Sequence, residues 1–435
     1  MTAIGPTPPR GGWRRAAALA GAAALAVLVG GCATLGDSNE RLQAQVSAAN
    51  PAAAQRVLDG AQRSRADEVL YRLNQGMLLR FQGEFVDSNV ALEEAKQRIE
   101  SLRALSLSEQ AGALAVSEGR RAYLGEPYEQ SLIYLYKALN YLALDDAHSA
   151  RVEMLQADLF LRSLKPEQRA RAAEPALRYV AGLVFEHLAE PDQAMVAYRL
   201  ALAALDRAKA EVPGPLRESL LQLSHRLGLS EEYTTLEQRF GPRPADRDPD
   251  AAELVLLIQA GLVPPKREQA VQALDPHSGR FYRIAAPYYP PRSGNATVRV
   301  SIDNPASEVR STLLQDLDAL SRRVLDDQMG AIMARAVARA VIKTQAVRQA
   351  ADRDPALGLL TNVATAMTER ADTRSWLTLP AQLHVARLHV PPGAHTVHVE
   401  VGTGAGRHRI TVEVPALAAG ERAFLAPHLP GSIGS

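Results

Sequence analysis

Three stretches between residues 51 and 240 repeat the same order of small and large residues, and this repetition restricts the fold more than any other feature. Apolar residues recur there at three- and four-residue spacings, the period of an α-helix. Each stretch has a small residue, a larger one three positions later, a turn, and small, large and small positions along a second helix. Helix backbones that cross at about 8–10 Å require small side chains. The sets are Gly76, Leu79, Gly83, Phe85, Ser88, Leu92 and Ala95; Ala138, Tyr141, Asp145, Ala147, Ala150, Met154 and Ala157; and Gly182, Phe185, Ala189, Pro191, Ala194, Tyr198 and Ala201.

This order of residues resembles the tetratricopeptide pattern, in which helical hairpins stack into an array. We therefore interpret residues 51–240 as a tetratricopeptide-like helical domain. The units lie farther apart than the ~34 residues of a standard array, so extra helices are expected, notably around 106–123, and a degenerate fourth unit at 216–240. An irregular helical bundle is the alternative. The residues expected to form the helix packing and a partner-binding groove are Gly76, Leu79, Ala138, Tyr141, Ala150, Gly182, Phe185 and Ala194.

The second half reads as a mixed α and β domain. Residues 241–250 are rich in proline and charge, which is typical of a linker. Residues 251–435 then alternate compact apolar runs with turn residues, the pattern of β-strands. The strands are expected at 253–258, 281–285, 296–302, 381–390, 395–401, 408–414 and 422–425, with a long helix over 311–351 and a buried one over 355–369. The predicted fold class is α+β multidomain: a helical repeat array followed by a smaller antiparallel-β domain that carries a long helix.

The N-terminus has the order of parts found in a secretory signal. Three arginines precede an uncharged run over 16–29, and Gly30 and Gly31 lead to Cys32, the single cysteine of the chain. The stretch from Val29 to Cys32 resembles the lipobox of bacterial lipoproteins, which implies cleavage before Cys32 and acylation of that residue. Residues 1–31 are then a signal peptide and 32–50 an acylated tether. A plain transmembrane anchor and an ordinary signal with a chance cysteine are the alternatives.

Several segments together resemble a family of uncharacterised Gram-negative outer-membrane lipoproteins with a tetratricopeptide-like front half. The resemblance implies a lipid-anchored protein on the periplasmic face of the outer membrane, and it implies no reaction. Asp145 departs from the family pattern, which tends to have glycine at this turn. The segments are 125–129, 134–142, 150–153, 371–376 with Leu379 and Pro380, and 388–393.

The sequence offers little that points to catalysis. Its net charge of +1 and 5% aromatic content argue against nucleic-acid binding. Nucleophile-elbow, zinc-protease and phosphate-loop motifs are absent from the sequence. Five C-terminal histidines are better explained as strand residues than as a zinc site, and we expect no catalytic residue, metal or cofactor. They are His384, His389, His395, His398 and His408.

Two further clusters have a structural and a functional interpretation. Arg335, Arg339 and Lys343 share a helix face, which favours a solvated surface over a ridge that binds anionic polymer. Asp372, Arg374 and Trp376 favour a segment pinned to a core over a ligand patch. The function expected from the sequence is a non-enzymatic scaffold that binds an unidentified envelope protein. The alternative is a carbohydrate-binding protein or hydrolase of the envelope, with its site in the C-terminal domain.

Overall fold

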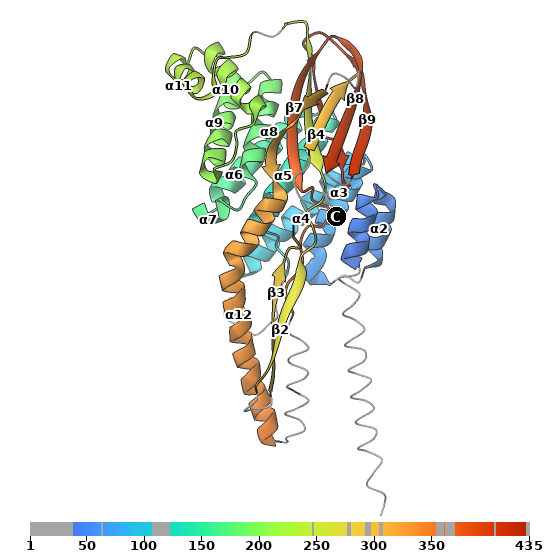
Figure 1. The fold of residues 1–435 in the computed structure, drawn as a ribbon, viewed down its shortest axis with the longest axis vertical. Coiled ribbons are helices and arrows are strands. Elements are labelled where there is room, and N and C mark those ends of the chain that lie inside the picture. The colour runs from blue at the N-terminus through green and yellow to red at the C-terminus, as the bar shows by residue number, and fades with distance from the viewer. Residues whose placement is uncertain are drawn as a thin grey trace, which may run out of the picture.

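The computed structural model describes residues 38–61, 64–106, 122–245, 248–275, 280–291, 297–303, 308–353, 361, 370–403 and 406–431. The chain is helix-rich, with a smaller β region and one long helix (Figure 1). The expected helix over 355–369, the extra helix around 106–123, the signal peptide and Cys32 lie wholly or largely outside the described residues.

The helical half consists of antiparallel hairpins that follow one another along the chain. Its elements are α2 (Pro51–Gly60), η1 (Arg65–Asp67), α3 (Glu68–Phe81), α4 (Phe85–Ser106), α5 (Pro127–Ala143), α6 (Ala147–Ser163), α7 (Pro166–Arg169), α8 (Glu174–His187), α9 (Pro191–Ala208), α10 (Gly214–Arg226) and α11 (Ser230–Phe240). Proline opens several of these helices, where its fixed φ and missing N–H cost nothing. The hairpins are α3–α4, α5–α6, α8–α9 and α10–α11, so the degenerate fourth unit is present as a hairpin.

The segment before α2 differs from the expected polar tether. Residues 38–47 form a helix, and its Leu42 and Val46 are buried against Tyr71 and Leu78 of α3. The side chain of Gln43 donates to two backbone carbonyls of the C-terminal half, at 2.8 and 2.9 Å. The described part of the tether is therefore packed into the molecule, because its few apolar residues fall on one helical face.

Within the described ranges the strands form three sheets. The central sheet has the order β10 (Arg422–Leu425), β1 (Ala252–Ala260), β7 (Gln382–Val390) and β6 (Thr312–Asp316), and β11 (His428–Leu429) also pairs with β1. The outer sheet has the order β5 (Glu308–Arg310), β4 (Thr297–Ile302), β8 (Gly393–Thr403) and β9 (Gly406–Leu417). A hairpin joins β2 (Arg267–Asp275) to β3 (Arg280–Tyr288). The expectation of a purely antiparallel domain is corrected, because β10 and β11 run parallel to β1.

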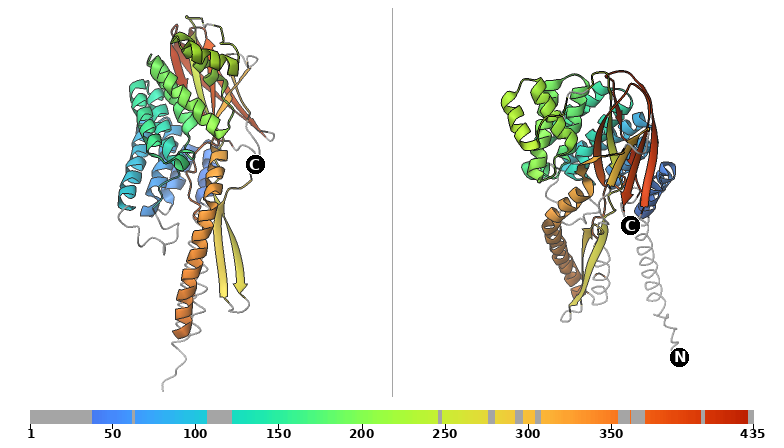
Figure 2. Two further views of the ribbon diagram at one scale, coloured as in Figure 1. Left: turned by 90° about the vertical axis from the view of Figure 1, so that its left-hand side faces the viewer. Right: turned by 45° about the horizontal axis from the view of Figure 1, so that its top comes forward.

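The central sheet lies between the helices and the outer sheet, so the body of the molecule has three layers (Figure 1, Figure 2). Strand β1 shows why. Leu254 and Ile258 pack with the outer sheet, whereas Val255 and Leu257 belong to the core that contains the helices. Alternate side chains of a strand point to opposite faces, so a strand buried on both faces has a continuous apolar run.

The long helix begins later than expected. Residues 312–316 pair with β7 as strand β6, and α12 spans Leu317–Arg353. The Asp316 carboxylate accepts from the backbone N–H of Ala319 at 2.8 Å and so caps the helix start. Figures 1 and 2 show α12 and the β2–β3 hairpin extending side by side from the three-layered body.

Candidate functional site

The small residues of the repeat lie where the two helices of a hairpin meet. A Cβ added at Gly76 would come 2.7 Å from Cγ of Leu92 in α4, and one added at Gly182 would come 2.2 Å from Cε1 of Tyr198 in α9. Ala138, Ala150 and Ala194 have no exposed surface. These positions therefore hold helix–helix contacts.

The larger residues of the repeat lie at the C-terminal end of the first helix of each hairpin, where their carbonyls accept the capping hydrogen bond. The carbonyls of Leu79, Tyr141 and Phe185 accept from the backbone N–H five residues later, at 3.0, 2.8 and 2.8 Å. This bond is part of the Schellman motif, which requires a left-handed residue just past the helix end. Asp145 has φ 58° in this position, so the turn keeps the same geometry without glycine.

The predicted groove is occupied by the chain's own C-terminal half. Every residue from 128 to 140 in α5 and from 174 to 185 in α8 is buried. The core on these helices includes Val255 and Leu257 of β1, Val385 of β7 and Trp376. The eight repeat residues form packing contacts, and none of them is exposed. The expectation of a groove open to a partner is thus corrected, because the central sheet covers this face.

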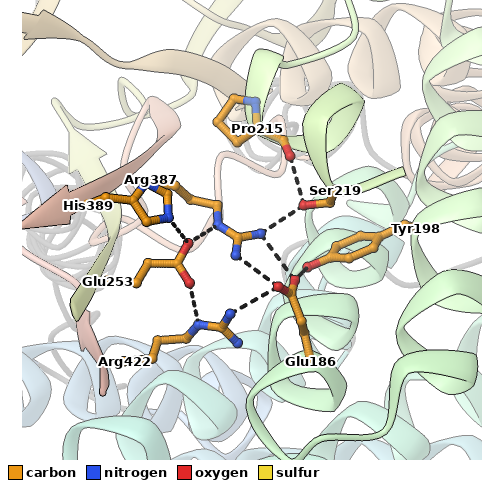
Figure 3. A network of polar contacts seen from close by, with 8 residues as sticks. All are labelled: Glu186, Tyr198, Pro215, Ser219, Glu253, Arg387, His389 and Arg422. Carbon is orange, nitrogen blue, oxygen red and sulfur yellow. Dashed lines mark hydrogen bonds and ion pairs between the residues drawn. The ribbon is translucent and has the colours of Figure 1, made fainter. Parts of the chain in front are cut away.

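A buried charge network joins the two halves (Figure 3). Glu186 of α8 and Glu253 of β1 supply two carboxylates, and Arg387 of β7 and Arg422 of β10 supply two guanidinium groups. Arg387 binds Glu253 at 2.6 Å and Glu186 at 3.0 Å, and Arg422 binds the same two carboxylates at 2.6 and 2.9 Å. The four formal charges cancel, and buried charges require such pairing.

The network is tied to the repeat through a tyrosine. The Tyr198 hydroxyl donates to Glu186 at 2.8 Å, and the Tyr198 ring packs on Gly182. Although burial raises it, the pKa of Glu186 is held well below its usual range by Arg387 and Arg422. Arg387 also donates to the Ser219 hydroxyl of α10 at 2.8 Å. Glu186 is therefore ionised and paired with both arginines, which indicates a structural role in holding the two halves together.

Two segments that carry the family resemblance meet in space. The Glu129 carboxylate accepts from the backbone N–H of Trp376 at 2.8 Å and from the Tyr123 hydroxyl at 2.6 Å. Arg374 pairs with Asp372 at 2.7 Å and with Asp67 at 3.0 Å. The cluster of residues 372–376 thus pins an extended segment to the helices.

The C-terminal histidines do not converge. His384 and His389 lie on opposite faces of β7, because they are five residues apart in a strand. His395 contacts Asp303 at 2.8 Å, and His398 contacts Thr411 at 3.1 Å on the outer sheet. Within the described ranges, no three histidine, cysteine or acidic side chains are placed to hold a metal ion.

The outward faces of the second helices carry a row of exposed valines. Val90 of α4, Val152 of α6 and Val196 of α9 occupy the same position in successive hairpins and are 53%, 49% and 46% exposed. Leu155 and Leu159 extend this outer valine row along α6. Lys96 of α4 reaches Gln156 of α6 at 2.9 Å, so these neighbouring helices are in contact. Sequence reasoning placed the partner surface on the other face; the signal for this row is valine at an equivalent position in three units.

Comparisons with known proteins add little to this geometry. No protein-family model matches the chain, and no curated protein matches it. Among solved structures, MamA AMB-1 superimposes with a TM-score of 0.29 at 12% identity, over 46% of this chain and 87% of that one. BtubC (BKLC) from P. vanneervenii superimposes with a TM-score of 0.29 at 13% identity, over 50% of this chain and 76% of that one. TM-scores this low do not establish a shared fold.

Among the residues that the structure describes, no helix combines the length and the apolar character needed to cross a membrane.

Proposed function

We propose that this protein is a non-enzymatic outer-membrane lipoprotein, anchored through Cys32 and facing the periplasm, that serves as a protein-interaction scaffold. The helical half is a tetratricopeptide-like array, with four hairpins among its described residues. Their common register supports this: the first helices end in left-handed residues Gly83, Asp145, Ala189 and Gly228. Repeat arrays are suited to binding because they present equivalent residues along an extended surface.

The outer valine row carries the proposal. Three aliphatic side chains at equivalent positions are about half exposed, and no described element of the chain covers them. Contiguous exposed apolar surface on a soluble domain marks interaction sites. The opposite face of the array is filled by the central sheet, so it is not accessible without unfolding. The partner is an envelope protein that presents an apolar helix, because residues 152, 155 and 159 form a helical stripe suited to helix–helix packing.

Site-specific crosslinking tests the surface. A photoreactive amino acid at Val90, Val152 or Val196 should crosslink to one and the same envelope protein in cells. The triple variant Val90→Glu, Val152→Glu and Val196→Glu should abolish the complex without loss of folding. A matched triple variant at Ala52, Gln269 and Ala416, which are exposed and lie outside the second helices, also changed to glutamate, should keep it.

Other outcomes would indicate self-association or refute the proposal. Crosslinks solely to a second copy of this chain, with a change in oligomeric state on sedimentation, would replace the scaffold by self-association. Full complementation of a deletion phenotype by the glutamate triple variant would overturn the proposal.

The anchor has its own experiment. Cys32→Ser should give an unprocessed chain that takes up no palmitate analogue, because serine has no thiol to receive lipid. Label retained by this variant would contradict anchoring through Cys32. The result is independent of the outer valine row, so each half of the proposal can fail alone.

A further inference from the structure

A cavity of about 340 Å³ lies where three parts of the molecule meet. Val46 of the helix over 38–47 lines one wall, and Arg80 and Phe81 of α3 line another. Gln259 of β1 and His428 of β11 contribute from the central sheet. Cavities of roughly 300–1,000 Å³ with apolar walls and few polar groups are typical of small-molecule sites.

Arg80 is a buried cation without a carboxylate partner. It is 6% exposed, and no aspartate or glutamate of the described ranges forms an ion pair with it. The comparably buried Lys137 and Arg178 both pair with carboxylates, Glu153 and Asp158 respectively. Burial without an opposite charge lowers the pKa of Arg80 to about 10. A buried and uncompensated charge is costly, so its retention needs a reason.

Neutral groups hold the Arg80 guanidinium in place. It donates through Nη1 to the Asn140 side-chain oxygen. Asn140 in turn donates to the Ser88 hydroxyl at 2.8 Å, and that hydroxyl donates to the carbonyl of Gly76 at 2.7 Å. The rings of Phe85 and Tyr136 lie 5.6 and 5.9 Å from the guanidinium carbon. This arrangement orients the cation but supplies no negative charge.

Two residues that line the cavity each carry a buried polar atom with no hydrogen-bond partner in the described part of the chain. Gln259 is fully buried, and its amide donates to the carbonyl of Ala426 at 3.1 Å, yet its Oε1 accepts no hydrogen bond within the described part of the chain. The buried Nε2 of His428 has no partner there either. The His428 ring stacks on Phe81 at a centroid distance of 4.0 Å. Buried polar atoms are nearly always hydrogen-bonded, so unpaired ones beside a cavity point to an external ligand.

We propose that this cavity binds a small organic anion whose carboxylate or phosphate pairs with Arg80 and whose apolar body packs against Phe81, Phe85 and Val46. Guanidinium recognises both headgroups through paired hydrogen bonds. Because Val46 belongs to the helix over 38–47, the ligand would contact both halves and the N-terminal segment at once.

Calorimetric titration of the full chain in non-ionic detergent tests this site with matched probes. We expect saturable binding of 4-phenylbutyrate or phenyl phosphate, and the tighter of the two identifies the headgroup. The neutral 4-phenylbutanol should bind at least about tenfold more weakly, since a hydrogen bond to a charged group accounts for a factor of this order. Arg80→Met should lower the affinity for the anion by a similar factor, whereas Arg56→Met, at an exposed arginine, should not.

A structural role for Arg80 gives different results. In that case Arg80→Met lowers the melting temperature while probe binding is absent or unchanged, and this outcome overturns the proposal. Should Arg80→Met fail to fold, Ala143→Phe provides the second test, because it narrows the cavity and keeps every polar group. Unchanged affinity in Ala143→Phe, or no saturable binding of either anion to the unmodified chain, would also refute the site.

Discussion

Ala189 holds a backbone conformation that residues with a side chain rarely adopt. Its φ is 56°, and the equivalent turns at Gly83 and Gly228 use glycine. Left-handed geometry brings Cβ close to the backbone carbonyl, at a cost of about 1–2 kcal/mol. The Schellman bond from Glu190 to Phe185 nevertheless forms at 2.8 Å. The tertiary packing of the hairpin thus overrides the local preference.

Ala189→Gly should therefore stabilise the protein, because it relieves strain on the order of 1 kcal/mol. The greater entropy of glycine in the unfolded chain offsets part of this gain. Urea unfolding would show a higher midpoint. Ala203→Gly is the matched control, because Ala203 is exposed within α9 and glycine there should destabilise by about 1 kcal/mol. A lower midpoint for Ala189→Gly would contradict the assigned role of this turn.

His384 makes stability depend on pH. It is 5% exposed, and its ring nitrogens contact Ser311 at 3.2 Å and Gln382 at 3.3 Å. Burial lowers its pKa to about 4, although nearby Asp316 opposes the shift. Below the unfolded pKa of about 6.5 the unfolded chain binds a proton that the folded chain does not. Folding stability must therefore fall as pH decreases from about 6.5 to 4.

The difference between the folded and unfolded pKa values corresponds to a loss of folding stability of up to about 3 kcal/mol at low pH. We expect His384→Gln to remove this loss. Urea unfolding at pH 7 and at pH 4.5 measures the change. His398→Gln is the control, because His398 is only partly buried on the outer sheet, whereas His384 is buried. An equal pH dependence in the unmodified chain and in His384→Gln would exclude His384 as its source.

At the scale of elements, each hairpin depends on close contact between its two helices. In α8–α9 this contact is close, since a Cβ at Gly182 would overlap Tyr198 at 2.2 Å. The Tyr198 ring cannot move aside easily, because its hydroxyl donates to Glu186 and its surface is fully buried. Glycine is needed here for close approach rather than for its conformational freedom.

Gly182→Ala should destabilise the protein by about 1–3 kcal/mol, the usual range for overpacking. Gly214→Ala provides the comparison, because no atom lies within 4 Å of the position that its Cβ would occupy. Thermal unfolding of both variants measures the difference. Similar melting temperatures would show that α9 can shift away from α8 without cost.

At the scale of the whole molecule, one interface holds the helical half to the central sheet. The charge network of Glu186, Glu253, Arg387 and Arg422 lies within this interface, beside the apolar core. Removing one cation leaves two buried carboxylates facing a single guanidinium. Such an uncompensated charge destabilises far more than the loss of an exposed ion pair.

Arg387→Met is therefore expected to cost about 3–5 kcal/mol. Arg239→Met is the control, because it removes an exposed pair with Asp206 and should cost less than about 1 kcal/mol. Urea unfolding with probes in each half would show whether the halves then unfold separately. A loss in Arg387→Met no larger than in the control would mean that the apolar core alone holds the interface.

The sequence by itself determined the local elements. Helical periodicity and repeated small residues set the hairpins. Apolar runs bounded by turn residues located strands such as 381–390 and 422–425, found at Gln382–Val390 and Arg422–Leu425. These features follow from contacts within about twenty residues, which a pattern along the chain records directly. The same reasoning placed the start of the long helix too early, because pairing of residues 312–316 with β7 is a distant contact.

Only the tertiary structure decided what the helical surfaces are used for. Periodicity shows that residues 51–240 form helices with apolar faces, but it cannot show whether a partner or the same chain covers the faces of α5 and α8. The central sheet covers them, which also brings Arg387 to Glu186 and leaves Arg80 beside a cavity. The physical reason is that burial depends on what packs from far along the chain, and no local spacing encodes that choice.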